Sequence, residues 1–573
     1  MTTLVPRGPY SQEELDRLYP KELKLQLVQI VRMKFSHLVP HFALPAPLTV
    51  QNTRDPSHLH PADPPSPPTH QLLRHGERSP VSARFQNAGL APFWPYCHAA
   101  RHLTSTILTT ASPPPSDPTV FSPLPWRRRL ETFGSHDASV LATGPSSSSS
   151  SSSSASHQQQ QHGNICNLGE LTDTGRLTTL ALGQRLRRLY VDQLSYMPSA
   201  IPDADMIYLR ATPMPRALES VQQAFWGLYP PSFRRSRGDE FPPPTVITRA
   251  PADETLFPNE ANCRRFSQLM KAFGVRAAQR WNGSEEMEYL SGRIGKWMPE
   301  EMAGEVKVDG HPRLSGVMDT VNSTLAHGKA TRLPGEFYEE RVRRIIDMIG
   351  VEEWFAGYKE SREYRQLGIG SLAGDVVARM VGRVERRGND GVLEVGGAEG
   401  ELGEGRGLGA FEGESWPPYT SHVAVELFKA EDREKVGGGQ LDVAATATTA
   451  GEQQQMKPKR SSGMMAKLFG SGGSEAQIAT EEGIARRPVS ELSPSEKQKL
   501  DGFFVRVRYN DRPIIVPGCR PPGKHWQGDE SFCTLEAFKS IVDKFTPRNW
   551  KSACVANLDQ PTIPDEIEAP GYE

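Results

Sequence analysis

The strongest constraint on the fold of this chain is one short run of residues, Leu73-Arg74-His75-Gly76-Glu77-Arg78-Ser79-Pro80. Its two arginines carry permanent charges on planar groups that match phosphate oxygens two at a time. The histidine between them can attack phosphorus and hold the phosphoryl group on nitrogen. Gly76 lets the backbone turn and approach a ligand, and Pro80 fixes the chain after the turn. Open sheets bind ligands at the carboxyl ends of their strands, so this run should follow a strand.

A second segment, residues 205–228, has compatible chemistry. Residues 205–210 (DMIYLR) predict a core strand, and apolar residues spaced three and four apart up to Leu228 predict a helix after it. We expect Thr212 to be the N-cap of this helix and Pro213 its first residue. Arg210 would then lie at a strand end beside a helix N-terminus, where backbone donors and the helix dipole hold anions.

A third segment predicts a helix that begins near Thr172, a natural N-cap, and buries a leucine stripe. The arginines in this helix, Arg185, Arg187 and Arg188, are expected on or beside its solvated face.

These residues resemble a known family. Residues 74–80 match the Arg-His-Gly-x-Arg-x-Pro signature of the histidine acid phosphatases, and residues 210–220 match the family's second phosphate-binding segment, Arg-Ala-Thr-x-x-x-Arg-Ala-Leu-Glu-Ser. The chain is similar to the acid-phosphatase branch of the histidine phosphatase superfamily, in particular to its lysophosphatidic acid phosphatase-like members, often labelled phosphoglycerate mutase-like. Ser79-Pro80 follows the acid-phosphatase pattern rather than that of the mutases.

The resemblance implies hydrolysis of phosphomonoesters through a phosphohistidine intermediate. His75 would be the nucleophile, and Arg74, Arg78 and Arg210 would bind the phosphate. No metal ion or organic cofactor is implied, because arginines take the place of a cation. The expected partner is a small phosphorylated substrate, and similarity alone points to a lysophospholipid.

The resemblance also implies the fold, an α/β three-layer sandwich with a mostly parallel central sheet and a small α-helical cap domain. A strand after Trp416 is expected to pair with residues 503–509. The expected organisation is an N-terminal segment and first strand (1–31), an insert (32–71), the first part of the core (72–245) with a disordered Ser/Gln loop (144–162), the cap and return to the core (246–381), a glycine-rich segment (382–415), and the last core strands and C-terminal part (416–429 and 502–573) around a disordered loop (430–501).

The insert at residues 32–71 separates the first strand, predicted over residues 23–31, from the turn that should follow it. This segment is rich in proline and histidine and has few periodic apolar positions, so it should be disordered. A looped-out insertion is one reading, since long loops cost little closure entropy. The preferred hypothesis is a translated intron, with Val31 joined directly to Leu72 or Leu73 in the authentic chain.

The proton donor expected for this branch, a His-Asp dipeptide after a core strand, is missing from residues 382–416, which contain no histidine and no apolar run for the preceding strand. Three other candidates for the donor exist. The His136-Asp137 pair lies in a loop-like region, and His422 on a strand is expected to be structural. Glu77, inside the turn, is a weak candidate to replace the missing dipeptide as donor. A faulty gene model or a decayed enzyme would explain these departures, so the alternative function is a catalytically inactive phosphate-binding pseudophosphatase or scaffold.

Composition limits the partners and the compartment. The formal net charge of −2 gives no reason to expect nucleic acid as a partner. No apolar run reaches the length of a transmembrane helix, and the first residues lack a signal-peptide pattern. The six cysteines show no metal-ligand spacing and are expected as free thiols; Cys519 and Cys533 would pair only in an oxidising compartment. An intracellular, cytoplasmic protein is expected, with a mitochondrial location as the alternative.

Overall fold

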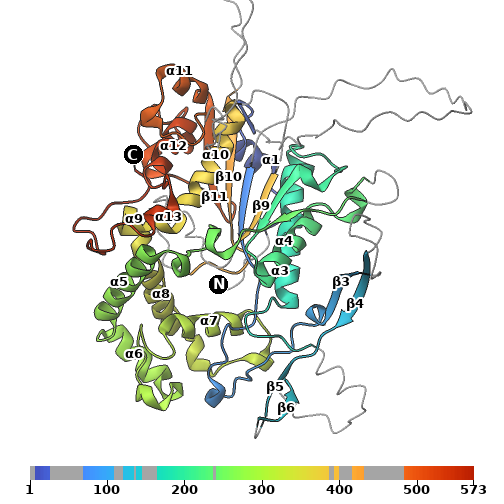
Figure 1. Ribbon diagram of the computed structural model, residues 1–573, viewed down its shortest axis with the longest axis vertical. Helices are drawn as coiled ribbons and strands as arrows, with labels where there is room; N and C mark the ends of the chain where they lie inside the picture. Colours follow the sequence, from blue (N-terminus) through green and yellow to red (C-terminus); the bar gives the residue numbers. More distant parts are fainter. Residues whose placement is uncertain are drawn as a thin grey trace, which may run out of the picture.

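The computed structural model describes residues 7–25, 69–108, 121–134, 137–144, 164–235, 241–385, 393–398, 416–430 and 483–572. Figure 1 shows a central sheet flanked by helices, with a further group of helices to one side of it. Most of the insert, the Ser/Gln loop and most of the loop expected at 430–501 lie outside the described residues.

One ten-stranded sheet forms the centre of the molecule, in the order β13-β14-β11-β10-β2-β9-β7-β8, with β1 paired to β10 and β12 paired to β11. Its strands are β1 (Leu23–Leu25), β2 (Thr69–Arg74), β7 (Ile207–Ala211), β8 (Val246–Ile247), β9 (Leu393–Ala398), β10 (His422–Ala430), β11 (Phe503–Tyr509), β12 (Arg512–Ile514), β13 (His525–Trp526) and β14 (Asp529–Thr534). Two small sheets stand apart, β3 (His102–Leu108) with β4 (Phe121–Arg127) and β5 (Glu131–Phe133) with β6 (Ser139–Leu141).

The expectation of a mostly parallel central sheet is wrong. Among the described strands of this sheet, β2, β9, β7 and β8 pair in parallel, in three pairings. The other six pairings are antiparallel and belong to the half of the sheet built on β10 and β11. Short turns connect β11 to β12 and β13 to β14, which is the connection that antiparallel neighbours allow.

Helices cover both faces of this sheet. Helices α3 (Asp173–Arg187) and α4 (Pro215–Leu228) pack on Leu73 of β2 and on β7. Helices α10 (Ser371–Glu385) and α12 (Leu535–Asp543) pack on the other face, against Leu72 and the apolar side chains of β10 and β11. Leu72 and Leu73 face opposite layers because successive strand residues point to opposite faces.

A group of helices between β8 and α10 forms two further apolar clusters. These helices are α5 (Arg264–Trp281), α6 (Glu285–Ile294), α7 (Leu314–Leu325), α8 (Glu340–Glu360) and α9 (Arg362–Arg365). Figure 1 shows α5 to α8 gathered away from the helices that cover the sheet. The remaining α-helices described are α1 (Gln12–Leu18), α11 (Pro494–Lys497) and α13 (Trp550–Ala553).

Of the predictions about helix ends and helix faces, one is confirmed and others are wrong. Thr172 caps α3 as predicted, with its side chain accepting a hydrogen bond from Gly175 N–H. Helix α4 begins later than predicted, with Met214 as N-cap and Pro215 as the first residue, so the assignment of Thr212 as the cap is wrong. Arg185 and Arg187 are buried rather than solvated. Arg185 pairs with Asp511 at 3.1 Å, so the apparent polar face of α3 is part of a buried ionic contact.

The glycine-rich segment after α10 contains β9, which lies between β2 and β7. The prediction that no core strand exists in this segment is therefore wrong. Strand pairing uses backbone groups, so a sequence without an apolar run can still form a central strand. Residues 399–415, in which a donor was expected and not found, lie outside the described residues.

Strands β1 and β2 lie end to end along β10. Leu25 is opposite Phe428, and Thr69 is opposite Glu426, so only the place opposite Leu427 separates them. The two segments therefore occupy one strand position, interrupted in the sequence after Leu25. The first strand was predicted to extend to Val31, but residues 26–31 lie outside the described residues.

All six cysteines are paired, as Cys97–Cys166, Cys263–Cys554 and Cys519–Cys533. The expectation of free thiols is wrong, because the fold brings together residues up to 291 positions apart in the sequence. In the described part of the chain, no helix is both long enough and apolar enough to cross a bilayer.

Candidate active site

The turn that follows β2 carries the three charged or nucleophilic residues predicted from the sequence. Arg74 ends β2, and His75 and Arg78 follow it directly. All three side chains are buried, and His75 is only 1% exposed. Tyr419 packs against this turn, with the Arg74 guanidinium 4.6 Å and the His75 ring 5.8 Å from the centre of its own ring.

Gly76 is required by the neighbouring helix rather than by a ligand. A Cβ atom at this position would lie 2.3 Å from the carbonyl oxygen of Gly175 in α3, and a Cβ at Gly175 would meet Glu77 O at 2.2 Å. The two backbones therefore touch where α3 begins. Gly76 N–H also donates to Ser220 Oγ of α4 at 3.2 Å. The turn is fixed between both helices of this face of the sheet.

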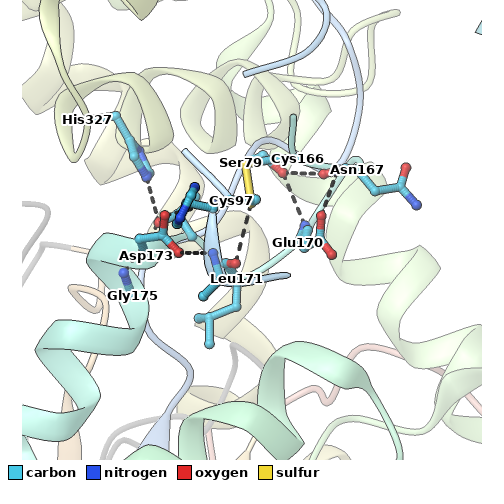
Figure 2. Close-up of a disulfide and its surroundings, with 12 residues drawn as sticks. Ser79, Cys97, Cys166, Asn167, Glu170, Leu171, Asp173, Gly175 and His327 are labelled. Carbon is cyan, nitrogen blue, oxygen red and sulfur yellow. Dashed lines mark hydrogen bonds between the residues drawn. A yellow bond between two sulfur atoms is a disulfide. The ribbon is translucent and has the colours of Figure 1, made fainter. Parts of the chain in front are cut away.

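The segment before α3 holds the other side of the turn (Figure 2). Ser79 Oγ donates to the carbonyl of Asn167 at 2.6 Å and accepts from Glu170 N–H at 3.1 Å. The Cys97–Cys166 disulfide anchors this segment next to Asn167, and Cys97 Sγ lies 3.5 Å from the carbonyl oxygen of Leu171. Hydrogen bonds of the Ser79 side chain thus hold the turn against a segment that is itself anchored by a disulfide.

The turn lines a cavity of about 610 Å³. Helix α7 and the start of α4 line other parts of it, as do Trp354 of α8 and the segment around Trp416. The lining side chains that carry charge or can ionise are Arg74, His75, Arg78, Arg84, Arg216, Glu260, His311, Arg313, Asp319 and Tyr419. The described residues contain no group of three or more His, Cys, Asp or Glu side chains arranged to hold a metal ion.

Arg216, and not Arg210, lines the cavity together with Arg74 and Arg78. Gly396 of β9 pairs with Arg210 of β7 on one side and with Leu72 of β2 on the other. Arg210 is therefore level with Leu72 in the sheet, two residues before the level of Arg74 at the end of β2. There it is buried against Glu254 and donates to Thr255 Oγ1 at 3.0 Å. Arg210 does not line the cavity, so its assignment as a phosphate ligand is corrected to a structural role.

Arg216 is the second residue of α4 and lines the cavity beside the turn. Its pKa is lowered to about 10, chiefly by burial and then by the nearby Arg78 charge. Positive charges held close together repel one another, so binding an anion between them lowers the electrostatic energy of the site. The backbone N–H groups at the N-terminus of α4 also favour a bound anion. Arg216 belongs to the same family-like segment, 210–220, but the sequence analysis assigned the phosphate to Arg210.

The His75 ring is held in one tautomer. Its Nδ1 lies 2.7 Å from the carbonyl oxygen of Gly76, which can only accept, so Nδ1 carries the proton and Nε2 the lone pair. Burial, followed by the charges of Arg78, Arg74 and Arg216, holds the His75 pKa well below its usual value of 6.5. The imidazole is therefore a neutral nucleophile even in mildly acidic solution.

The sequence candidates for a proton donor do not lie in the cavity. Glu77 is completely buried, with its carboxylate bonded to Thr178 of α3, and it does not line the cavity. His422 lies in the core, 3.3 Å from Asp511. His136 lies outside the described residues, so the His136-Asp137 pair cannot be placed.

Asp319 on α7 is an acidic residue of the cavity that pairs with an arginine of the turn. Its Oδ1 lies 2.8 Å from Nη2 of Arg78, and its Oδ2 lies 3.8 Å from Nη1 of Arg84. The Oδ2 atom also accepts a hydrogen bond from Val81 N–H at 3.2 Å. Nothing in the local sequence around Asp319 pointed to this position.

Comparisons with known proteins show which family the chain belongs to. A family model described as the histidine phosphatase superfamily (branch 2) matches residues 69–390. A probable acid phosphatase of Schizosaccharomyces pombe is 34% identical over 490 residues, which span 84% of this chain and 92% of that protein. Human lysophosphatidic acid phosphatase type 6 is 27% identical over 204 residues, spanning 35% of this chain and 42% of that protein. A phytase of Hafnia alvei in its apo form has a TM-score of 0.44 at 11% identity, over 87% of this chain and 99% of the other. The chain belongs to branch 2 of the histidine phosphatase superfamily.

Proposed function

We propose that this protein hydrolyses phosphomonoesters, with His75 as the nucleophile and Arg74, Arg78 and Arg216 as the phosphate ligands. The observation that carries the proposal is the presence of all four side chains on the wall of one cavity. Membership of the superfamily supports the same reaction, as does the similarity to a probable acid phosphatase.

In the first step, Nε2 of His75 attacks the phosphorus atom. The N–P bond forms while the bond from phosphorus to the ester oxygen breaks, and the leaving oxygen takes up a proton. Negative charge on the equatorial oxygens is stabilised by the three arginines, which stand ready before the substrate arrives. In the second step, water attacks the phosphohistidine, and orthophosphate leaves with the imidazole neutral again.

The apolar wall of the cavity supports a finer proposal for the substrate. The cavity that holds the arginines is also lined by Met214, Phe257, Met318, Trp354 and Trp416. A substrate with a phosphate for the arginines and an apolar group for these side chains would match this lining. A lysophospholipid has this chemistry, and a human relative bears the name lysophosphatidic acid phosphatase.

Hydrolysis of p-nitrophenyl phosphate by a His75→Ala variant tests the proposal. We expect kcat/KM to fall by about a thousandfold or more, because the nucleophile is lost. The matched control is His102→Ala, which removes an exposed histidine of β3 and should leave activity unchanged. Wild-type protein that binds orthophosphate but does not turn over aryl phosphate would instead support the inactive phosphate-binding alternative.

A further inference from the structure

Hydrolysis of an alkyl phosphate requires a proton for the departing oxygen, because an alkoxide is a poor leaving group. The His-Asp pair expected to supply it is missing from the segment between α10 and β10. Two acidic side chains among the described residues line the cavity, Glu260 and Asp319. Glu260 is exposed, whereas the Asp319 side chain is 14% exposed and contacts the phosphate-binding turn.

We propose that Asp319 is the general acid that protonates the leaving group. This inference rests on the proposed phosphohistidine chemistry and adds a catalytic residue to it.

The position of Asp319 is fixed by three contacts. One carboxylate oxygen bonds Arg78, and the other accepts from the backbone of Val81 and lies within ion-pair distance of Arg84. A phosphate oxygen bound by Arg78 would lie within hydrogen-bond length of the same guanidinium group. The carboxyl and phosphoryl oxygens would then be about 3–5 Å apart, which is close enough for direct or water-mediated proton transfer.

Asp319 and His75 reach the cavity from different elements. His75 comes from the turn after β2, whereas Asp319 comes from α7. In-line displacement places the leaving oxygen on the side of phosphorus away from the attacking nitrogen, so the proposal requires Asp319 to donate from that side.

The proton balance then closes over the two steps. In the first step, the Asp319 proton passes to the departing oxygen, the N–P bond forms and the alcohol leaves. In the second step, the Asp319 carboxylate takes a proton from the attacking water, the N–P bond breaks and orthophosphate is released. Asp319 and His75 return to their starting states, and no further reactant is needed.

An Asp319→Asn variant separates proton donation from phosphate binding. We expect kcat/KM for glycerol 2-phosphate to fall by about 10²- to 10³-fold, because the alkoxide is no longer protonated. For p-nitrophenyl phosphate, whose leaving group needs little protonation, the fall should be less than about tenfold. Asp309→Asn, at an exposed position outside the cavity, is the matched control.

Three outcomes would overturn the proposal. Equal losses on both substrates, together with weaker inhibition by orthophosphate, would mean that Asp319 only positions Arg78. Unchanged alkyl hydrolysis would mean that another group donates the proton. Wild-type protein that hydrolyses aryl but not alkyl phosphate would have no working donor, although the phosphohistidine chemistry would stand. A thermal shift on adding orthophosphate shows that each variant is folded and binds.

Discussion

Arg210 and Arg216 lie six positions apart in one segment, yet the structure gives them different roles. Arg210 is within the sheet and holds Glu254, whereas Arg216 faces the cavity from the first turn of α4. The sequence identified the segment but not which arginine lines the cavity, since either Pro213 or Pro215 is an acceptable first helical residue. Arg74, His75 and Arg78 were easier to predict, because one short turn keeps them together whatever surrounds it.

Replacing the two arginines should therefore have different effects, one on catalysis and one on stability. Arg216→Ala should lower kcat/KM and weaken orthophosphate inhibition by about 10- to 100-fold, the cost of a lost bond to a charged group. Arg210→Ala should instead cost about 3–5 kcal/mol of unfolding free energy, because Glu254 is left buried without its partner. Kinetics and urea denaturation measure the two effects. The reverse pattern would return the phosphate-binding role to Arg210.

The pH dependence of turnover should report the environment of His75. Burial and three arginines hold its pKa well below 6.5, so activity on p-nitrophenyl phosphate should persist as the pH falls through 6. The same shift has a stability cost. The unfolded chain binds a proton here near pH 6.5 and the folded chain does not, so the contribution of His75 to folding becomes less favourable as the pH falls below 6.5. An acid limb of kcat/KM at pH 6.5 or above would contradict this account.

At the scale of secondary structure, the sequence predicted strands and helices correctly where the spacing of apolar residues showed a clear strand or helix period. The strand after Trp416 pairs with residues 503–509 as expected, and Thr172 caps its helix. Strand β9 was missed because its sequence, LEVGGA, has no apolar run. The direction of most pairings was also wrong, since direction depends on which strands become neighbours in the sheet and not on any one segment.

The interrupted strand leads to a prediction about a shortened chain. Joining Gln26 directly to Thr69 places one residue opposite Leu427 and keeps both β1 and β2 in register with β10. We expect the product to fold and to hydrolyse aryl phosphate, with a stability gain of about 3 kcal/mol if loop-closure entropy is the main difference. Denaturation midpoints and turnover of both chains provide the test. A shortened chain that is unfolded would show that residues 27–68 are needed for this strand.

At the scale of the whole molecule, the disulfides were the least predictable feature. Six cysteines allow fifteen pairings, and only the fold decides among them. Cys263 and Cys554 meet because the chain after α12 returns to the start of α5. Disulfides persist chiefly in oxidising compartments, so the redox state of these six cysteines is open to a direct test.

Thiol titration of the unfolded, unreduced protein checks this pairing. We expect no reactive thiols before reduction and six after it, because each cysteine has a partner. A Cys97→Ser/Cys166→Ser double variant should lose about 2–4 kcal/mol of stability. Six thiols before reduction would show that the protein is made without these bridges.

The most direct test of the central claim is to trap the phosphorylated enzyme. Protein mixed with radiolabelled p-nitrophenyl phosphate is quenched in alkali within milliseconds, digested and mapped. We expect acid-labile label on the peptide that contains His75, at normal levels in the His102→Ala control and absent from His75→Ala. Label on another residue, or label that survives His75→Ala, would contradict the phosphohistidine mechanism at this cavity.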